Sequence, residues 1–286
     1  MKTLIKACLV LSCLIICTSF QPGDKWENLL DKNMSKWDTY LSFKHTNGDQ
    51  GRIPKDANGN DVKPIGYNKD TAHVFSVVME NGEPEIRISG EIYGCVFTKQ
   101  DFGNYHLRLK VRWGDKKYEP RLNDYMDSGV LYNSQGEAGV DYWHSWMLGQ
   151  EFQVGEGTTG DYWPIASSHA DIRVTKRPDT TTYIFNPKGE VRDFGGYCQA
   201  SGNFETKGKH AWTQLDLISF EGKSLHIVNG HVVMALNNSR YKSGNEFKPL
   251  THGKIQLQSE AAEVYYKDIQ IRHIDKIPAE YAAYLK

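Results

Sequence analysis

The stretch Trp146-Met-Leu-Gly-Gln-Glu-Phe-Gln-Val-Gly-Glu156 alternates between two sets of side chains as a β-strand does. We expect one row to face a core, and it consists of Trp146, Leu148, Phe152 and Val154. The opposite row consists of Met147, Gly149, Glu151 and Gln153. This second row sets a carboxylate beside an amide, and its glycine leaves room for a ligand. Gly155 then allows a local kink, and Glu156 follows as a second carboxylate. Alternatively, the strand is half-buried and its polar row faces water.

The composition suits one large β-rich domain. The chain has 286 residues, 39% of them hydrophobic and 24% charged, with a formal net charge of −1. This near-neutral balance argues against nucleic acid or an anionic membrane as the main partner. Aromatic residues make up 12% of the chain, a share that is typical of β-structure and of sugar-binding surfaces.

Residues 1–20 are typical of a signal peptide. A basic start precedes an apolar run at residues 7–18, which is too short to span a bilayer. Cleavage after Ser19 is one interpretation. The other is a lipoprotein signal, because Val10-Leu-Ser-Cys13 resembles a bacterial lipobox. We therefore expect an exported protein that is periplasmic or anchored to the outer membrane. No later segment is long and apolar enough to cross a membrane.

Two cysteines follow the leader, Cys95 and Cys198. In an exported protein they could form a disulfide; alternatively, they are two separate buried thiols. No CxxC motif and no clustered Cys and His spacing indicates structural zinc.

The segment from Tyr105 to Trp113 is the clearest of about a dozen predicted strands, because its aliphatic and basic residues alternate. Asn229-Gly230 predicts a hairpin with a type I′ turn. A change of parity in the last strand predicts a bulge near Lys267-Asp268. Residues 44–70 show no apolar period, so we expect a long loop at one rim.

Many strands, tight turns and scarcely any helix pattern predict an all-β sandwich of two antiparallel sheets. No internal repeat and no low-complexity linker divides the chain. We therefore expect a single β-sandwich domain over residues 24–275. The remaining residues, 276–286, would be a C-terminal tail with a short helix from Pro278 onward.

The motif Glu151-Phe-Gln-Val-Gly-Glu156 is similar to the E-x-D-x-x-E strand of laminarinase-like retaining glucanases, in which the two glutamates are nucleophile and acid/base. Here Gln153 replaces the middle aspartate. Because an amide cannot tune neighbouring carboxylates as an acid does, this departure argues against the glucanase mechanism.

A wider set of segments resembles the 3-keto-disaccharide hydrolase family across nearly the whole mature chain. The segments are Gly90-Glu-Ile-Tyr-Gly94, Phe102-Gly-Asn-Tyr-His-Leu-Arg-Leu109, Asp127-Ser-Gly-Val-Leu-Tyr132, Trp146-Met-Leu-Gly-Gln-Glu-Phe-Gln153, Gly160-Asp-Tyr-Trp163, the Asn229-Gly230 hairpin and Gly253-Lys-Ile-Gln-Leu-Gln258. The resemblance implies an exported bacterial protein with a concanavalin A-like jelly roll. Asp127 stands where the family usually carries Asn, and Lys267 where it often carries Arg.

The resemblance implies cleavage of glycosidic bonds in 3-keto sugars. A ketone at C3 acidifies the hydrogen on C2, so a base can remove it and the resulting enolate can expel the C1 substituent. Our first candidate for the base is Glu151, and Gln153 would position the sugar or its oxygen. Asp127 and Glu156 are further catalytic candidates.

Other residues near the central strand are candidates for substrate binding. Tyr162 and Trp163 could stack on a sugar ring or simply pack their loop. Gln258 would share the side of the sheet expected for Glu151, and Glu260 would lie in the following turn near the same rim. Tyr132 or His169 would lie at the groove edge. His144 and His169 could act as acid/base groups or metal ligands, or be surface histidines.

No cofactor is specified by the sequence, although a divalent ion held by Glu151, Asp127 and a histidine is one alternative. The remaining alternatives for the whole protein are a non-catalytic lectin-like carbohydrate-binding module and a retaining glucanase.

Overall fold

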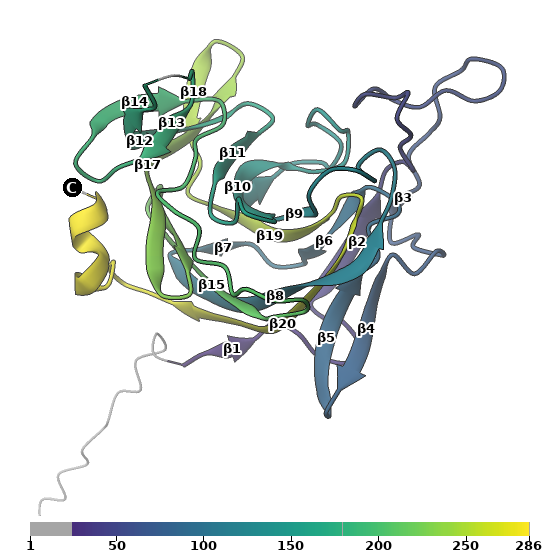
Figure 1. Ribbon diagram of the computed structural model, residues 1–286, viewed down its shortest axis with the longest axis horizontal. Helices are drawn as coiled ribbons and strands as arrows, with labels where there is room; N and C mark the ends of the chain where they lie inside the picture. Colours follow the sequence, from purple (N-terminus) through teal and green to yellow (C-terminus); the bar gives the residue numbers. More distant parts are fainter. Residues whose placement is uncertain (1–24, 179, 286) are drawn as a thin grey trace, which may run out of the picture.

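The computed structural model describes residues 25–178 and 180–285, and nearly all of its regular structure is β-strand (Figure 1). The strands form two antiparallel sheets that stack face to face, as the sequence predicts. The expected signal peptide lies outside the described residues. No helix within the described ranges has the length and apolar character needed to span a membrane.

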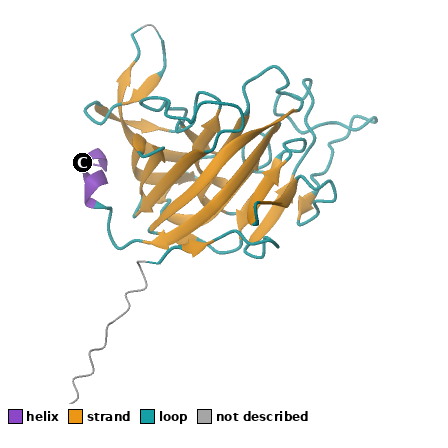
Figure 2. Ribbon diagram, turned by 60° about the horizontal axis from the view of Figure 1, so that its bottom comes forward, coloured by secondary structure: helices purple, strands orange, loops and turns teal. Residues whose placement is uncertain are grey.

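The larger sheet has twelve strands, and its long strands run side by side across the molecule in Figure 2. Its order is β13 (Tyr183–Phe185), β12 (Ser168–Lys176), β17 (His231–Ser243), β16 (Lys223–Val228), β15 (Thr213–Phe220), β8 (Tyr105–Lys117), β20 (Ala262–His273), β5 (Glu83–Ile88) and β4 (Phe75–Glu80). Three further strands pair with β20, β12 and β17 respectively: β1 (Glu27–Asn28), β14 (Glu190–Phe194) and β18 (Glu246–Pro249).

The smaller sheet has eight strands and positions the candidate site. Its order is β11 (Tyr162–Ile165), β10 (Leu148–Gly155), β9 (Asp127–Gln135), β19 (His252–Ser259), β6 (Gly94–Thr98), β2 (Trp37–Leu41) and β3 (Gly66–Tyr67), while β7 (Phe102–Gly103) pairs with β19. The predicted helix in the tail is the 3₁₀-helix η2 (Ala279–Leu285). Tyr281 and Tyr284 of η2 pack against an apolar cluster around β12 and β17.

The main core fills the space between the sheets. From the larger sheet, β8 contributes Leu107, Leu109 and Val111, as its alternation predicts, and from the smaller sheet β10 contributes Phe152 and Val154. Side chains from two facing sheets that interdigitate in this way remove both apolar faces from water. Because Phe152 and Val154 face the core, the opposite face of β10, which carries Glu151 and Gln153, is the one that can form a site.

The smaller sheet is also covered on its outer face, by a second apolar cluster that includes Tyr93, Cys95, Leu131 and Trp146. Our prediction that Trp146 belongs to the inner row is wrong, because Trp146 lies in this outer cluster, whereas Leu148 is only partly buried and is not among the core residues. Strand alternation applies only to paired, extended backbone, and Trp146 precedes the first residue of β10.

Two predicted local features are confirmed by the backbone. Asn229 and Gly230 have φ of 46° and 81° between β16 and β17, as a type I′ turn requires. The register of β20 against β8 shifts between Lys267 and Gln270, and Asp268 has a φ of 52°, which identifies the expected bulge.

The long loop at residues 44–70 projects from one rim of the sandwich in Figure 1, as predicted, and contains only the two-residue strand β3. Cys95 and Cys198 are both free, buried thiols that lie in separate apolar clusters. The disulfide interpretation is therefore wrong.

Candidate active site

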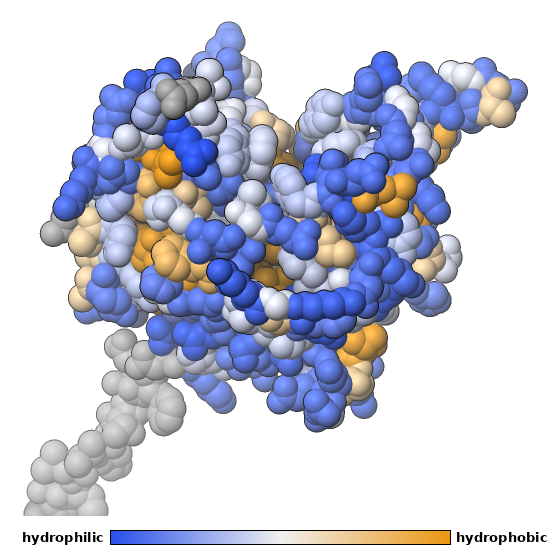
Figure 3. All heavy atoms as spheres, viewed as in Figure 1, coloured by the Kyte–Doolittle hydropathy of each residue, from blue (hydrophilic) through white to orange (hydrophobic). Residues whose placement is uncertain are grey.

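A cavity of about 560 Å³ opens on the outer face of the smaller sheet, in the size range of small-molecule sites. Strands β9 and β10 supply Asp127, Glu151 and Gln153. The walls come from residues 121–127, from the loop at residues 141–146, from β11 and from residues 195–196. Figure 3 shows the molecule notched at its upper edge between the lobe that carries β12 to β14 and the loops opposite.

Arg121 joins two carboxylates in this cavity. Its Nη1 donates to Oδ2 of Asp127 at 2.5 Å, and its Nη2 donates to Oε1 of Glu260 at 2.6 Å. The other oxygen of Asp127 accepts a hydrogen bond of 2.6 Å from Nε2 of Gln153. All four side chains are largely removed from water, so these charge-assisted bonds fix their positions.

Glu151 differs from the other two acids, because no described residue donates a hydrogen bond to its carboxylate although it is only 5% exposed. Its position depends on Gly129 in the neighbouring strand β9. A Cβ at Gly129 would lie 2.4 Å from Oε1 of Glu151 and 2.5 Å from Oε1 of Gln258. The missing side chain at Gly129 therefore lets Glu151 and Gln258 approach each other across β9.

The amide of Gln258 is also unusual. Neither its Oε1 nor its Nε2 has a hydrogen-bond partner among the described residues, although the side chain is buried. A buried amide without partners is costly, and such a group is typical of a site that a ligand completes.

Burial dominates the electrostatics of the three acids. It raises the pKa of Asp127 to about 6, even though Arg121 and the hydrogen bond from Gln153 act in the opposite direction. Burial, together with the charges of Glu260 and Asp127, raises the pKa of Glu151 well above its usual range. Burial and the charge of Asp127 do the same to the pKa of Glu260. One guanidinium faces several buried carboxyl groups, and their raised pKa values make this cavity the candidate for proton transfer.

Several residues proposed from the sequence meet here. Those that line the cavity are Asp127, Glu151, Gln153, Trp163 and Glu260. Gln258 lies beside Glu151 beneath them. The residues on β9, β10, β11 and β19 share one face, because the registers of these strands place them on the same side of the sheet. The alternation in the sequence indicates this side.

Two predicted tyrosines lie in the core instead, so their assignment to the substrate site is wrong. Tyr132 projects between the sheets, where its hydroxyl lies 2.7 Å from Oγ of Ser224. Tyr162 pairs with Phe152 across β10 and β11, which directs both side chains to the inner face. Their neighbours Leu131 and Trp163 occupy the outer face.

Glu156 and the two histidines also lie outside the cavity. Glu156 is exposed in the turn after β10, where its carboxylate accepts a hydrogen bond from the backbone N–H of Met126. It lines a separate cavity at the end of the sandwich. His169 lies behind Gly195 and is 3.0 Å from Asp193, and His144 occupies the loop without lining the cavity.

The described residues do not provide the ligand set that a divalent metal ion would need. Within residues 25–178 and 180–285, no three His, Cys, Asp or Glu side chains are grouped as a metal site requires. The histidine that the alternative would combine with Glu151 and Asp127 does not reach them.

Several residues that build the cavity were not predicted from the sequence. Arg121 follows Pro120 in a segment without alternation, and only its position six residues before Asp127 could have drawn notice. Asp141 accepts hydrogen bonds from the backbone N–H groups of Trp143, Ser145 and Trp146, and thereby shapes the loop. A short acid ahead of an aromatic cluster is a signal for such a turn.

The fold and the cavity together define an antiparallel β-sandwich with an acidic cavity on its smaller sheet. The chain belongs to the family of 3-keto-alpha-glucoside-1,2-lyase-like domains, whose model matches residues 25–272. This membership places the protein among proteins that act on carbohydrates. No curated protein sequence matches the chain.

Solved structures with a partial likeness include three proteins that cover most of the chain. A Parabacteroides distasonis protein provisionally described as a glycosyl hydrolase has 15% identity and a TM-score of 0.47, covering 88% of this chain and all of its own. The carbohydrate-binding module CBM66 of Bacillus subtilis has 8% identity and a TM-score of 0.41, covering 69% and 91%. A Bacillus licheniformis β-glucanase has 10% identity and a TM-score of 0.37, covering 88% and 98%.

Proposed function

We propose that this protein is an exported bacterial enzyme that cleaves the glycosidic bond of 3-keto glycosides or 3-keto disaccharides. The observation that carries the proposal is the buried carboxyl group of Glu151, which no described residue hydrogen-bonds and which lies beside the unpartnered amide of Gln258. Family membership supports the same substrate class.

Glu151 acts as the base in this proposal. Its carboxylate takes the proton from C2 of the sugar, and the C2–H electron pair forms the enolate with the C3 ketone. The enolate then expels the C1 substituent, which leaves as an alcohol after it receives a proton. Water adds to the resulting unsaturated ketone and completes the cleavage.

The environment of Glu151 favours this step. Because burial raises its pKa, its carboxylate is a stronger base than an exposed glutamate, which suits a weakly acidic C–H bond. The same shift extends to higher pH the range over which Glu151 carries a proton. The proton must be lost before the first step.

Arg121 and Gln258 supply the hydrogen-bond donors in this proposal. The guanidinium places a fixed positive charge in the cavity, and Nε2 of Gln258, beneath the lining residues, has no hydrogen-bond partner among the described residues. Such groups stabilise an enolate oxygen that develops negative charge in the transition state. Asp127 and Gln153 would hold Arg121 and the sugar in position.

Two other functions remain as outcomes of the test. A retaining glucanase would need a second carboxylate across the scissile bond, and Glu156 lines a different cavity from Glu151. A lectin-like module would bind neutral sugars without needing three buried carboxyl groups.

Incubation of the purified protein with 3-keto-trehalose or a 3-keto-glucoside, beside the unoxidised parent sugar, tests the proposal. We expect release of 3-keto-glucose from the oxidised sugar only, because the C2 hydrogen of the parent is not acidic. Cleavage of laminarin or another unoxidised glucan at a similar rate would favour the glucanase instead. Binding of either sugar without turnover would establish the module.

A further inference from the structure

The mouth of the cavity is aromatic, whereas its floor is ionic. Six aromatic side chains are exposed in the described part of the chain: Tyr67, Tyr125, Tyr142, Trp163, Phe204 and Phe247. Three of them, Tyr125, Tyr142 and Trp163, line this one cavity. Exposed apolar surface that gathers at one opening indicates an apolar binding partner.

Trp163 is held in place but remains open to solvent. Its pairing with Glu151 across β10 and β11 directs it to the same face as the candidate base. Its ring centroid is 4.7 Å from that of Tyr197, whose hydroxyl donates to Asp161 at 2.6 Å. Trp163 is nevertheless 41% exposed, so its free surface is available to a ligand.

Two of the polar side chains that line the mouth are engaged by the protein. The hydroxyl of Tyr142 donates to the backbone oxygen of Gln50 at 2.5 Å, which ties the rim to the loop at residues 44–70. The carboxylate of Asp141 accepts three backbone hydrogen bonds. A second sugar would bring several hydroxyls that need partners here, whereas a flat apolar ring needs none.

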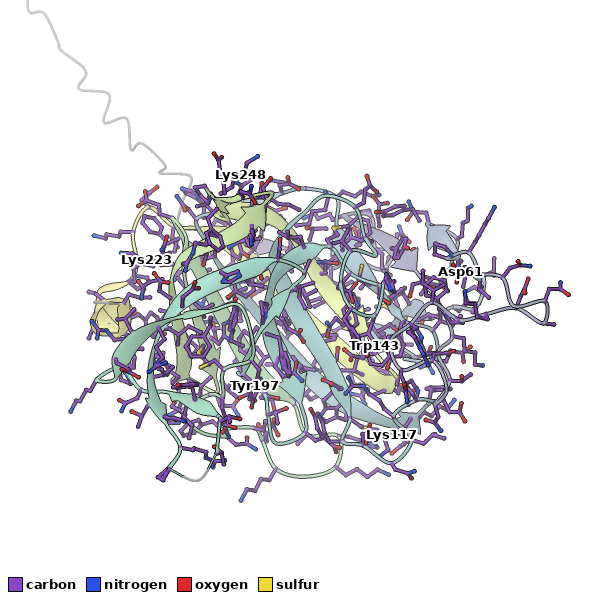
Figure 4. The ribbon with its side chains drawn as sticks, turned by 90° about the horizontal axis from the view of Figure 1, so that it is seen from above. Asp61, Lys117, Trp143, Tyr197, Lys223 and Lys248 are labelled. Atoms are coloured by element: carbon purple, nitrogen blue, oxygen red, sulfur yellow. The ribbon has the colours of Figure 1, made fainter. Side chains whose placement is uncertain are left out.

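Gly196 leaves room for such a ring. A Cβ at this residue would meet no atom within 4 Å, although Gly196 lines the cavity. Figure 4 shows Trp143 and Tyr197 apart from one another on the same upper face of the molecule, and Trp143 is a further aromatic wall of the mouth.

We propose that the mouth between Trp163, Tyr142 and Gly196 is an aglycone subsite for a planar, apolar group such as a substituted benzene ring, rather than for a second sugar. This inference rests on the proposed function, because it assigns the sugar to the floor beside Glu151 and the leaving group to the mouth.

A comparison of benzyl and methyl 3-keto-glucosides of one anomeric configuration tests the subsite, since the two leaving alcohols have similar acidity. We expect kcat/KM for the benzyl compound to exceed that for the methyl compound by about tenfold, through the burial of the ring. A 3-keto disaccharide should be cleaved less efficiently than the benzyl compound. A benzyl-to-methyl ratio near one, or a clear preference for the disaccharide, would overturn the proposal.

Variants of Trp163 and Gly196 test whether the preference for the benzyl compound arises at the mouth of the cavity. Trp163→Ala should reduce the benzyl-to-methyl ratio to about two, and Trp163→Phe should retain most of the ratio. Gly196→Leu should fill the mouth and lower the ratio in the same way. Phe204→Ala, which removes an exposed aromatic ring outside the cavity, should leave the ratio unchanged. A ratio that survives both Trp163→Ala and Gly196→Leu would contradict the location.

Binding separates failure of this inference from failure of the proposed function. If neither 3-keto-glucoside is cleaved, calorimetry of benzyl and methyl glucoside with the wild-type protein still reports on the mouth. Tighter binding of the benzyl compound that is lost in Trp163→Ala would support the subsite without the chemistry. Equal binding of the two compounds would refute the subsite.

Discussion

Glu151 and Glu156 are five positions apart in the sequence, yet they line two different cavities. The first cavity, on the outer face of the smaller sheet, buries three carboxyl groups around Arg121. The second, of about 290 Å³ at the end of the sandwich, contains Asp115, which lies 2.8 Å from Lys209 and 3.0 Å from His210. Hydrogen bonds from Lys209 and His210 lower the pKa of Asp115, whereas burial raises that of Asp127.

The comparison shows that surroundings, not residue type, decide what a carboxylate can do. Water solvates the acids of the second cavity, and exposed ion pairs of this kind stabilise a fold weakly. In the first cavity the scarcity of water raises the pKa values toward neutrality. The raised pKa values therefore make the first cavity, rather than the second, the candidate for proton transfer.

Among the substitutions in the two cavities, Glu151→Gln in the first cavity should lower kcat/KM the most. The amide keeps the shape of the side chain but cannot accept the C2 proton, and loss of a general base costs on the order of 10²–10⁴ in rate. The measurement is kcat/KM on a 3-keto glycoside. Wild-type kcat/KM should rise with pH as Glu151 loses its proton, over a range above that of an ordinary glutamate.

The control for this variant is Glu83→Gln, at an exposed carboxylate of the β4–β5 hairpin. It should match the wild type in rate and in thermal unfolding. A Glu151→Gln protein that cleaves the 3-keto glycoside at the wild-type rate would eliminate Glu151 as the base.

Arg121→Met should break both ion pairs of the first cavity, with Asp127 and with Glu260. Removal of the guanidinium leaves Asp127 and Glu260 buried without a counter-charge, and breaking a buried ion pair in this way costs about 3 kcal/mol in the free energy of unfolding. Denaturant unfolding at pH 7 measures this cost. It should shrink at acidic pH, because protonation of the two acids removes the unpaired charge.

Lys209→Met is the matched change in the second cavity, since it removes one exposed partner of Asp115. It should alter the free energy of unfolding by less than about 1 kcal/mol. Equal costs for the two variants would show that the buried and exposed pairs do not differ as we infer.

Asp127→Asn should have a smaller effect on activity than Glu151→Gln and should change how stability depends on pH. The folded-state pKa of Asp127 is raised to about 6, so its protonated form stabilises the fold below the unfolded pKa, and this contribution is lost as pH rises through 6. Relative to Asp127→Asn, the wild type should therefore gain about 1 kcal/mol between pH 7 and pH 5. Parallel stability curves for the two proteins would contradict the raised pKa.

Glu156→Gln should give the smallest effect. Glutamine keeps an oxygen that can accept the hydrogen bond from the backbone of Met126, and the residue lies outside the acidic cavity. We expect kcat/KM on a 3-keto glycoside within about twofold of the wild type. A loss comparable to that of Glu151→Gln would restore Glu156 as a working partner of Glu151.

Much of the fold follows from local patterns in the sequence. The alternation in β8 and the inner row of Phe152 and Val154 place the core, and Asn229-Gly230 fixes a hairpin because its turn needs two residues with positive φ. The same period of two places Glu151, Gln153 and Gln258 on one side of the smaller sheet. These features depend on neighbours in the chain or in the next strand, so they can be read without coordinates.

The tertiary structure decided which loops cover that side and which carboxylates meet there. Period-two alternation separates two faces but does not reveal that both faces of β9 and β10 are buried, so Tyr132 and Trp146 could not be assigned correctly. Arg121 reaches Glu260 across 139 positions of sequence, and no local pattern encodes such a contact. The sequence by itself thus determined the sandwich and the identity of its central acid. Only the folding of distant loops over that acid removed the water and raised its pKa.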